Sequence, residues 1–94
     1  MRGRSMLPTL RDGDLLLVRR RRGDDLVGRL AVVTLPDRPL AVKRITAREP
    51  GGWWVERDNP AEGVDSWTVG AVPDPDVHAV VVARLWPAPA LLRR

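Results

Sequence analysis

The sequence contains no cysteine, no phenylalanine and no tyrosine. The absence of cysteine excludes disulfide bonds, thiolate nucleophiles and zinc sites with thiolate ligands, and it leaves the redox compartment open. His78 is the only histidine, so a metal site with several histidine ligands is excluded as well. We therefore expect neither a metal nor another cofactor.

Long apolar runs are also missing. No segment approaches the roughly 20 consecutive apolar residues that a membrane-spanning helix needs. The first residues lack the apolar region of a signal peptide. The C-terminal LWPAPALLRR is apolar but short and interrupted by proline, so it can at most touch a surface. We expect a cytoplasmic protein with at most peripheral membrane contact. The alternative is membrane association on the extracytoplasmic face through a span upstream of Met1.

Much of the net charge of +4 comes from the run Arg19, Arg20, Arg21 and Arg22. Such a run can bind the phosphates of a nucleic acid or an anionic membrane. It lacks the interleaved aromatic side chains that stack on single-stranded bases, and no helix-turn-helix segment is present. We interpret the run as a solvated loop between two strands and expect no nucleic-acid partner. The sequence does not indicate the oligomeric state.

Short apolar segments alternate with turn residues at the spacing of β-hairpins, and no window shows a helical period. Ninety-four residues suffice for one modest core. The sequence therefore predicts one all-β domain over residues 1–94, a small barrel or sandwich. Trp53 and Trp54 are adjacent in a predicted strand, so they point to opposite sides and we expect one of them in the core. The predicted strands cover residues 15–18, 30–35, 40–46, 53–57, 68–72 and 78–86.

Serine is scarce, and Ser5 stands beside Met6 and three residues before Pro8. A serine in this position is either a turn residue or a nucleophile, and a nucleophile requires a base. His78 is one candidate, although a lone histidine at a strand end is more often a surface residue. The pattern S-x-x-K is absent, because Pro8 occupies the place of the lysine.

Lys43 is the only lysine, against fifteen arginines. It lies inside the strand predicted at residues 40–46 and shares a face with Ala41 and Ile45. A neutral lysine can activate a serine, and removal of water from an ammonium group favours its neutral form. The simpler interpretation is an edge-strand lysine that discourages aggregation. Both interpretations stay open on these residues alone.

Three segments, in order and spacing, resemble the conserved boxes of the signal peptidase I family: SMLPTLRDGDLLLV, AVKRI and DNPAEGVDSWTVGAV. These Ser–Lys serine endopeptidases have a β-rich catalytic fold that is shared with the LexA-type self-cleaving repressors. The resemblance runs from about Gly3 to Trp86. Pro8 and Thr9, together with the D-N and D-S pairs, favour signal peptidase over the repressors. The small form, with GGWWV before the D-N pair, also resembles the soluble branch that matures nickel superoxide dismutase precursors.

The resemblance implies that Ser5 is the nucleophile and Lys43 the general base, with the backbone N–H of Ser5 as an oxyanion donor. Asp65 with Ser66 would hold the active-site strands in register. The substrate would be a precursor protein or peptide, bound as an added strand beside the residues near Ser5 and those before Lys43, and cleaved after a small residue. The residues implied to line the pocket for that small side chain are Met6, Leu10, Ala41 and Val42.

Four positions depart from the family pattern: Gly3, Arg57, Gly63 and Trp67. Gly63 replaces a serine that usually hydrogen-bonds the lysine, so we expect slower turnover rather than none.

Two alternatives to leader cleavage follow from the same residues. One is a non-catalytic peptide-binding relative with this fold, and the other is a LexA-like self-cleaving regulator.

Overall fold

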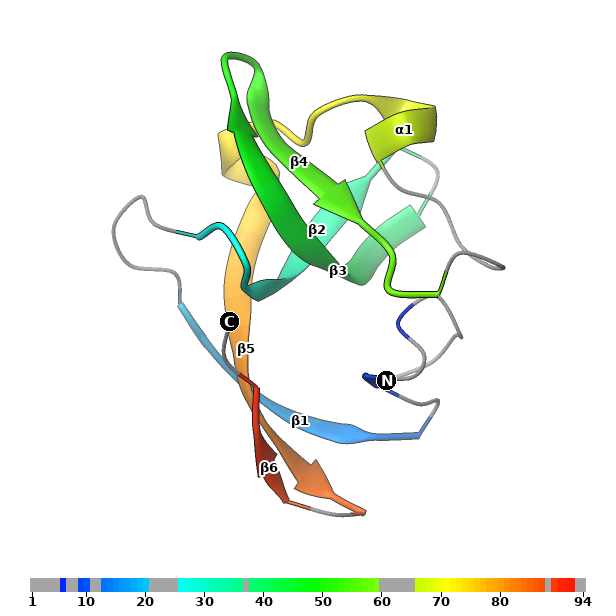
Figure 1. Cartoon of the computed structure of the whole chain (residues 1–94), viewed down its shortest axis with the longest axis vertical. Coiled ribbons are helices and arrows are strands. Elements are labelled where there is room, and N and C mark those ends of the chain that lie inside the picture. The colour runs from blue at the N-terminus through cyan, green and yellow to red at the C-terminus, as the bar shows by residue number, and fades with distance from the viewer. Residues whose placement is uncertain are drawn as a thin grey trace.

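In the computed structural model, residues 6, 9–10, 13–20, 26–36, 38–59, 66–87 and 89–92 are described, and most of them lie in antiparallel strands (Figure 1). The strands form one six-stranded sheet with the order β1-β5-β2-β3-β4, and β6 also pairs with β5. The prediction of an all-β fold is confirmed. Over the described residues the sheet is open, with β1 and β4 at its two ends. The elements are β1 (Leu15–Arg20), β2 (Leu30–Leu35), β3 (Arg38–Glu49), β4 (Gly52–Glu56), α1 (Ser66–Val69), η1 (Asp74–Asp76), β5 (Val77–Trp86) and β6 (Ala90–Leu91).

β5 is the strand that joins the two parts of the sheet. It pairs with β1 along most of its length. It also pairs with β2 near its start, where Val80 lies opposite Ala31, and with β6 near its end, where Ala83 lies opposite Leu91. As a result, β1, β6 and the end of β5 project from the body formed by β2, β3 and β4 (Figure 1).

Two clusters of buried side chains form the core. Adjacent residues of β5 contribute to different clusters, Val80 to the first and Val81 to the second, as expected from the alternation of side chains along a strand. The first cluster contains Leu26, Ala31, Val33, Leu35, Ile45, Trp53, Val55, Val72, Val77 and Val80. The second contains Met6, Leu10, Leu30 and Val81.

The structure corrects two predictions of local structure. Arg19 and Arg20 belong to β1 rather than to a loop, although both are exposed, as a solvated run requires. Residues 68–72 do not form a strand. Ser66–Val69 is one helical turn, and Gly70 ends it with a positive φ of 84° and an N–H that donates to the Ser66 carbonyl. Among the described residues, no helix combines the length and apolar character needed to cross a bilayer.

Trp53 is the tryptophan that lies in the core, as predicted for one of the adjacent pair. It is fully buried, its indole N–H donates to Asp74 at 2.9 Å, and the Arg48 guanidinium lies 4.3 Å from its ring centre. Trp54 is half-buried on the other side and packs edge-on against Trp67, with ring centres 5.2 Å apart. These contacts fix both sides of β4.

β4 approaches the segment before η1 closely. Trp53 and Val72 exchange two backbone hydrogen bonds, at 2.7 and 2.8 Å. Gly52 lies at φ +138°, and a Cβ at this position would collide with the Val72 carbonyl group. Gly51 has open space around the corresponding position.

We expect Gly52→Ala to lower the free energy of unfolding by about 2 kcal/mol or more, because backbone strain adds to the collision with Val72. Gly51→Ala, the matched control, should change it by no more than about 0.5 kcal/mol. Urea unfolding followed by tryptophan fluorescence measures both. Equal effects of the two substitutions would contradict the close approach.

Candidate active site

Lys43 lies within β3 and is only 1% exposed. β3 has β2 on one side and β4 on the other. Lys43 lies opposite Ala31 of β2, and its neighbours on the same face are Ala41 and Ile45. At 1% exposure, Lys43 does not present its charge to solvent as an edge-strand lysine that discourages aggregation would. Its neighbours along that face are small or apolar, as the alternation in the sequence predicted.

The segment that follows Ser5 packs against the other face of β3. Ser5 itself lies outside the described residues. Met6 and Leu10 are completely buried in the second cluster, and the Leu10 N–H donates to the Met6 carbonyl at 2.9 Å. Val42, the neighbour of Lys43, packs against that cluster. The residue that follows Ser5 and the residue that precedes Lys43 thus belong to one packed group.

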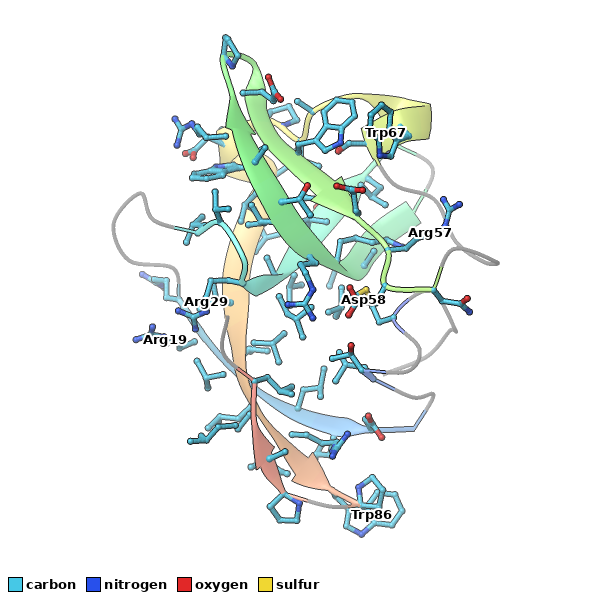
Figure 2. All side chains as sticks on the ribbon, in the orientation of Figure 1. Arg19, Arg29, Arg57, Asp58, Trp67 and Trp86 are labelled. Carbon is cyan, nitrogen blue, oxygen red and sulfur yellow. The ribbon has the colours of Figure 1, made fainter. Side chains whose placement is uncertain are left out.

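An ion pair joins the second and third sequence motifs. Arg44 donates from Nε to Asp58 Oδ1 at 3.0 Å and from Nη2 to Asp58 Oδ2 at 2.9 Å. Its remaining terminal nitrogen, Nη1, donates to the Gly28 carbonyl at 3.1 Å. This two-pronged geometry fixes the orientation of the guanidinium as well as its position. Figure 2 shows Asp58 beyond the end of β4, on the side of the molecule where the N-terminal segment lies.

The first motif is attached to the same ion pair. The Thr9 hydroxyl donates to Asp58 Oδ2 at 2.5 Å. Arg84 of β5 donates to the Thr9 carbonyl at 3.5 Å and lies 3.9 Å from the Asp14 carboxylate. One carboxylate therefore holds residues from all three motifs, which are separated by 35 and 14 positions in the sequence.

The ion pair changes the acidity of both partners. Burial acts to raise the pKa of Asp58, but the hydrogen bonds from Arg44 and Thr9 and the charge of Arg44 outweigh it, so this pKa lies below its usual value. The hydrogen bond with Asp58 raises the pKa of Arg44, against the effect of burial and with the help of the opposite charge. Asp58 therefore remains a carboxylate at neutral pH.

Within the described residues, part of β3 has no neighbouring strand on one side. β3 covers twelve residues, but β4 pairs with it only from Arg44 onward. On the side away from β2, no strand within the described residues pairs with residues 38–42. Leu40 in this stretch is exposed. A free strand edge of this kind can bind an extended peptide through backbone hydrogen bonds.

Ser66 is buried at the start of α1, and its hydroxyl accepts a hydrogen bond from the Val55 N–H at 2.8 Å. This bond ties the helical turn to β4. Asp65 lies outside the described residues. The predicted partner role of Ser66, holding strands in register, is compatible with this contact.

The remaining predicted residues are distributed over both faces of β3. Ala41 packs against the first cluster and Val42 against the second, so the structure brings Met6, Leu10 and Val42 together but not Ala41. His78 is exposed and hydrogen-bonds Thr34 at 2.7 Å, which matches the expectation of a surface histidine.

Arg44 and Asp58 were missed as functional residues. Asp58 stands in D-N-P, a common turn sequence, so its type and position alone do not indicate a role in the site. The available signal was that each of the three motifs contains one member of the network, namely Thr9, Arg44 and Asp58. No local pattern connects residues so far apart in the chain.

We expect Asp58→Asn to lower the free energy of unfolding at pH 7 by about 1–2 kcal/mol, through loss of charged hydrogen bonds in a half-buried setting. Because the pKa of Asp58 is lower in the folded than in the unfolded protein, its stabilisation is complete above the unfolded value of about 3.9 and disappears as the pH falls through the folded value. The difference between wild type and variant should therefore shrink below about pH 4.

Urea unfolding at a series of pH values measures this difference. Thr46→Val is the control, because Thr46 makes only a long side-chain bond, at 3.4 Å, away from this network. A difference between wild type and Asp58→Asn that stays constant down to pH 2 would contradict the role of the ionised carboxylate.

Comparison with known proteins agrees with this arrangement of motifs. The sequence profile described as Peptidase S24-like matches residues 1–82. No curated protein and no solved structure matches the chain at a significant level. Since the matched region includes Ser5, Lys43 and the Asp65-Ser66 pair, and covers most of the sequence, the chain belongs to the Peptidase S24-like family.

Proposed function

We propose that the protein is a serine endopeptidase that removes an N-terminal leader from a precursor after a small residue, with Ser5 as nucleophile and Lys43 as general base. The observation that carries the proposal is the burial of Lys43, the only lysine, in β3 directly after Val42, which packs with Met6. Membership of the Peptidase S24-like family supports a serine-type peptidase in general, without specifying its substrate.

The proposed chemistry needs no cofactor. Neutral Lys43 accepts the proton of the Ser5 hydroxyl while Oγ attacks the carbonyl carbon of the scissile bond, and the backbone N–H of Ser5 donates to the resulting oxyanion. The tetrahedral intermediate then collapses. The C–N bond breaks, the amine leaves with the proton from Lys43, and an acyl ester remains on Ser5. Water activated by Lys43 hydrolyses that ester and restores both side chains.

Removal of Lys43 from water supports its role as base. A side chain must be neutral to accept a proton, and loss of hydration disfavours an ammonium group. Arginine would not serve, because it keeps its proton under all ordinary conditions. The adjacent arginine, Arg44, is engaged with Asp58, and so carries a structural charge one residue from the proposed base.

The open edge of β3 supports binding of the substrate as an added strand. Residues 38–42 would pair with the backbone of the leader, with Ala41 and Val42 closest to the residue before the scissile bond. Met6 and Leu10 are completely buried, so they would support the substrate site from beneath.

The contacts of Thr9 support a positioning role for Asp58. Thr9 follows Ser5 by four residues, and Arg44 follows Lys43 directly, so the carboxylate that binds both would hold the nucleophile segment against the strand of the base. In this proposal Asp58 does not touch the substrate.

We expect Ser5→Ala and Lys43→Met each to lower kcat/KM by at least about a thousandfold, because nucleophile and base act as one unit. The assay uses an internally quenched peptide with alanine before the scissile bond. Lys43→Arg should be equally inactive, although it preserves a positive charge. Circular dichroism checks that the variants are folded. Near-normal cleavage by Lys43→Met would refute the mechanism.

A penem inhibitor tests whether the serine is reactive. Intact-mass spectrometry should detect one acyl group on the wild type and on Ser66→Ala, assayed below its unfolding temperature, but none on Ser5→Ala. Since Ser5 and Ser66 are the only serines, these two variants assign the label. Absence of label from the wild type would favour the non-catalytic peptide-binding alternative.

The family match also favours a second candidate, self-cleavage of the LexA type. Here the cleaved bond belongs to the same chain. A self-cleaving chain loses intact protein at a rate that does not depend on its concentration, whereas cleavage of a separate precursor scales with enzyme concentration. We expect cleavage of a separate precursor rather than of the chain itself, so the full-length chain incubated alone at several concentrations should stay intact by mass spectrometry.

A further inference from the structure

Trp67 carries the most exposed indole ring of the chain, and its position is fixed by its neighbours. The residue is 75% exposed. Ser66, directly before it, is buried and accepts a hydrogen bond from the Val55 N–H at 2.8 Å. The edge-on contact with Trp54 orients the ring. An exposed aromatic side chain that is already oriented loses little conformational entropy when it binds a partner.

The Trp67 ring lies beside a carboxylate. Its indole N–H donates to Glu56 Oε1 at 3.2 Å. Glu56 ends β4 and lies opposite Arg44 of β3, but Arg44 directs all three of its guanidinium nitrogens to Asp58 and to the Gly28 carbonyl. A carboxylate has two oxygens and accepts several hydrogen bonds, so Glu56 can bind a further donor while it holds the indole.

The buried tryptophan of β4 shows which group completes such a pair. The Trp53 indole N–H also donates to a carboxylate, that of Asp74, at 2.9 Å. The Arg48 guanidinium lies over the Trp53 ring, 4.3 Å from its centre. The negative face of an indole ring attracts a cation, and a nearby carboxylate adds to this attraction. A tryptophan bonded to an acidic side chain therefore already binds a guanidinium at one place in this chain.

The pair of Trp67 and Glu56 lies on the side of the sheet that faces the N-terminal segment. Glu56 and Arg44 are directly opposite each other, so their side chains share one face of the sheet. On that face Arg44 contacts Asp58, which binds Thr9. Figure 2 shows Trp67 and Asp58 along the same side of the molecule. The pair is therefore a neighbour of the candidate active site.

The direction of the substrate brings its later residues toward this pair. In the proposed function, the leader pairs with residues 38–42 and the scissile bond lies beyond Val42, so the substrate runs parallel to β3. β4 occupies the same side of β3 from Arg44 onward, so the chain after the scissile bond must leave the strand edge there. Glu56 lies opposite Arg44, two positions beyond Val42. At about 3.3 Å per residue, an extended chain comes level with Glu56 within its first few residues.

We propose that Trp67, with Trp54 and Glu56, binds an arginine or lysine side chain of the substrate a few residues after the scissile bond. The inference rests on the proposed function, which supplies the direction of the substrate. The cation would lie on the exposed ring of Trp67 and donate to the Glu56 carboxylate. An apolar side chain would cover the ring but leave the carboxylate without a counterion, and an anionic side chain would be repelled.

Peptide binding to Ser5→Ala tests the proposal, because this variant leaves the peptides intact. Each peptide has alanine before the scissile bond and carries arginine, citrulline or leucine at the second, third or fourth position after it. Citrulline has nearly the shape of arginine but no charge. By fluorescence anisotropy of labelled peptides, we expect arginine to lower the dissociation constant about fivefold relative to citrulline at one or more positions, as a cation–π contact and an exposed ion pair together allow.

Two variants in the Ser5→Ala background assign this preference to the site. Trp67→Leu removes the aromatic ring, and Glu56→Gln removes the charge but keeps an acceptor for the indole N–H. We expect each to reduce the preference for arginine to less than about twofold. Trp86→Leu and Glu49→Gln change exposed residues away from the pair, so these matched controls should retain the fivefold preference. Circular dichroism checks that all four are folded.

Equal binding of the arginine and citrulline peptides at all three positions would overturn the proposal, and so would absence of binding. Tightest binding of the leucine peptide would also overturn it, because the surface would then select apolar side chains. A preference for arginine that survives in both Trp67→Leu and Glu56→Gln would place the cation elsewhere.

Failure of the proposed function gives a different result. A wild type that cleaves none of the peptides, although Ser5→Ala prefers arginine and Trp67→Leu removes this preference, would refute the endopeptidase and support the cation site.

Discussion

The Asp58 carboxylate is the contact on which the arrangement of the candidate site depends. It accepts two hydrogen bonds from Arg44 and one from Thr9, and it thereby connects the N-terminal segment, the middle of β3 and the chain beyond β4. The N-terminal segment precedes the first strand, so sheet pairing alone does not hold it. Burial of Met6 and Leu10 supplies the apolar part of its attachment, and Asp58 supplies the directional part.

Adjacent residues of β3 have opposite electrostatic roles. Lys43 is buried on one face of the strand, while Arg44, one position later, points to the other face and is paired with a carboxylate. The two cations are not interchangeable, because arginine forms the two-pronged contact and stays charged, whereas lysine can lose its proton when water is removed. Because side chains alternate along the strand, the structural charge of Arg44 and the proposed catalytic amine of Lys43 lie on opposite faces.

Local patterns were sufficient to predict much of this fold. The alternation in residues 40–46 predicted the face of Lys43, and the turn residues bounded β2 correctly at residues 30–35. The strand predicted at residues 68–72 failed because Gly70 closes a helical turn that β-branched composition does not reveal. The contact between Thr9 and Asp58 spans 49 positions. It depends on how the whole chain folds, and no short stretch of the sequence carries that information.

The length of β5 has a consequence for how the molecule unfolds. Its adjacent residues Val80 and Val81 belong to different core clusters, so both clusters depend on the same strand. Detachment of β1 and β6 would expose Val81 and weaken the same backbone that supports Val80, and loss of β2 would do the reverse. The described part of the chain should therefore unfold as one cooperative unit. Amides of β1 and of β2, which flank β5, should exchange with solvent at similar free energies of opening.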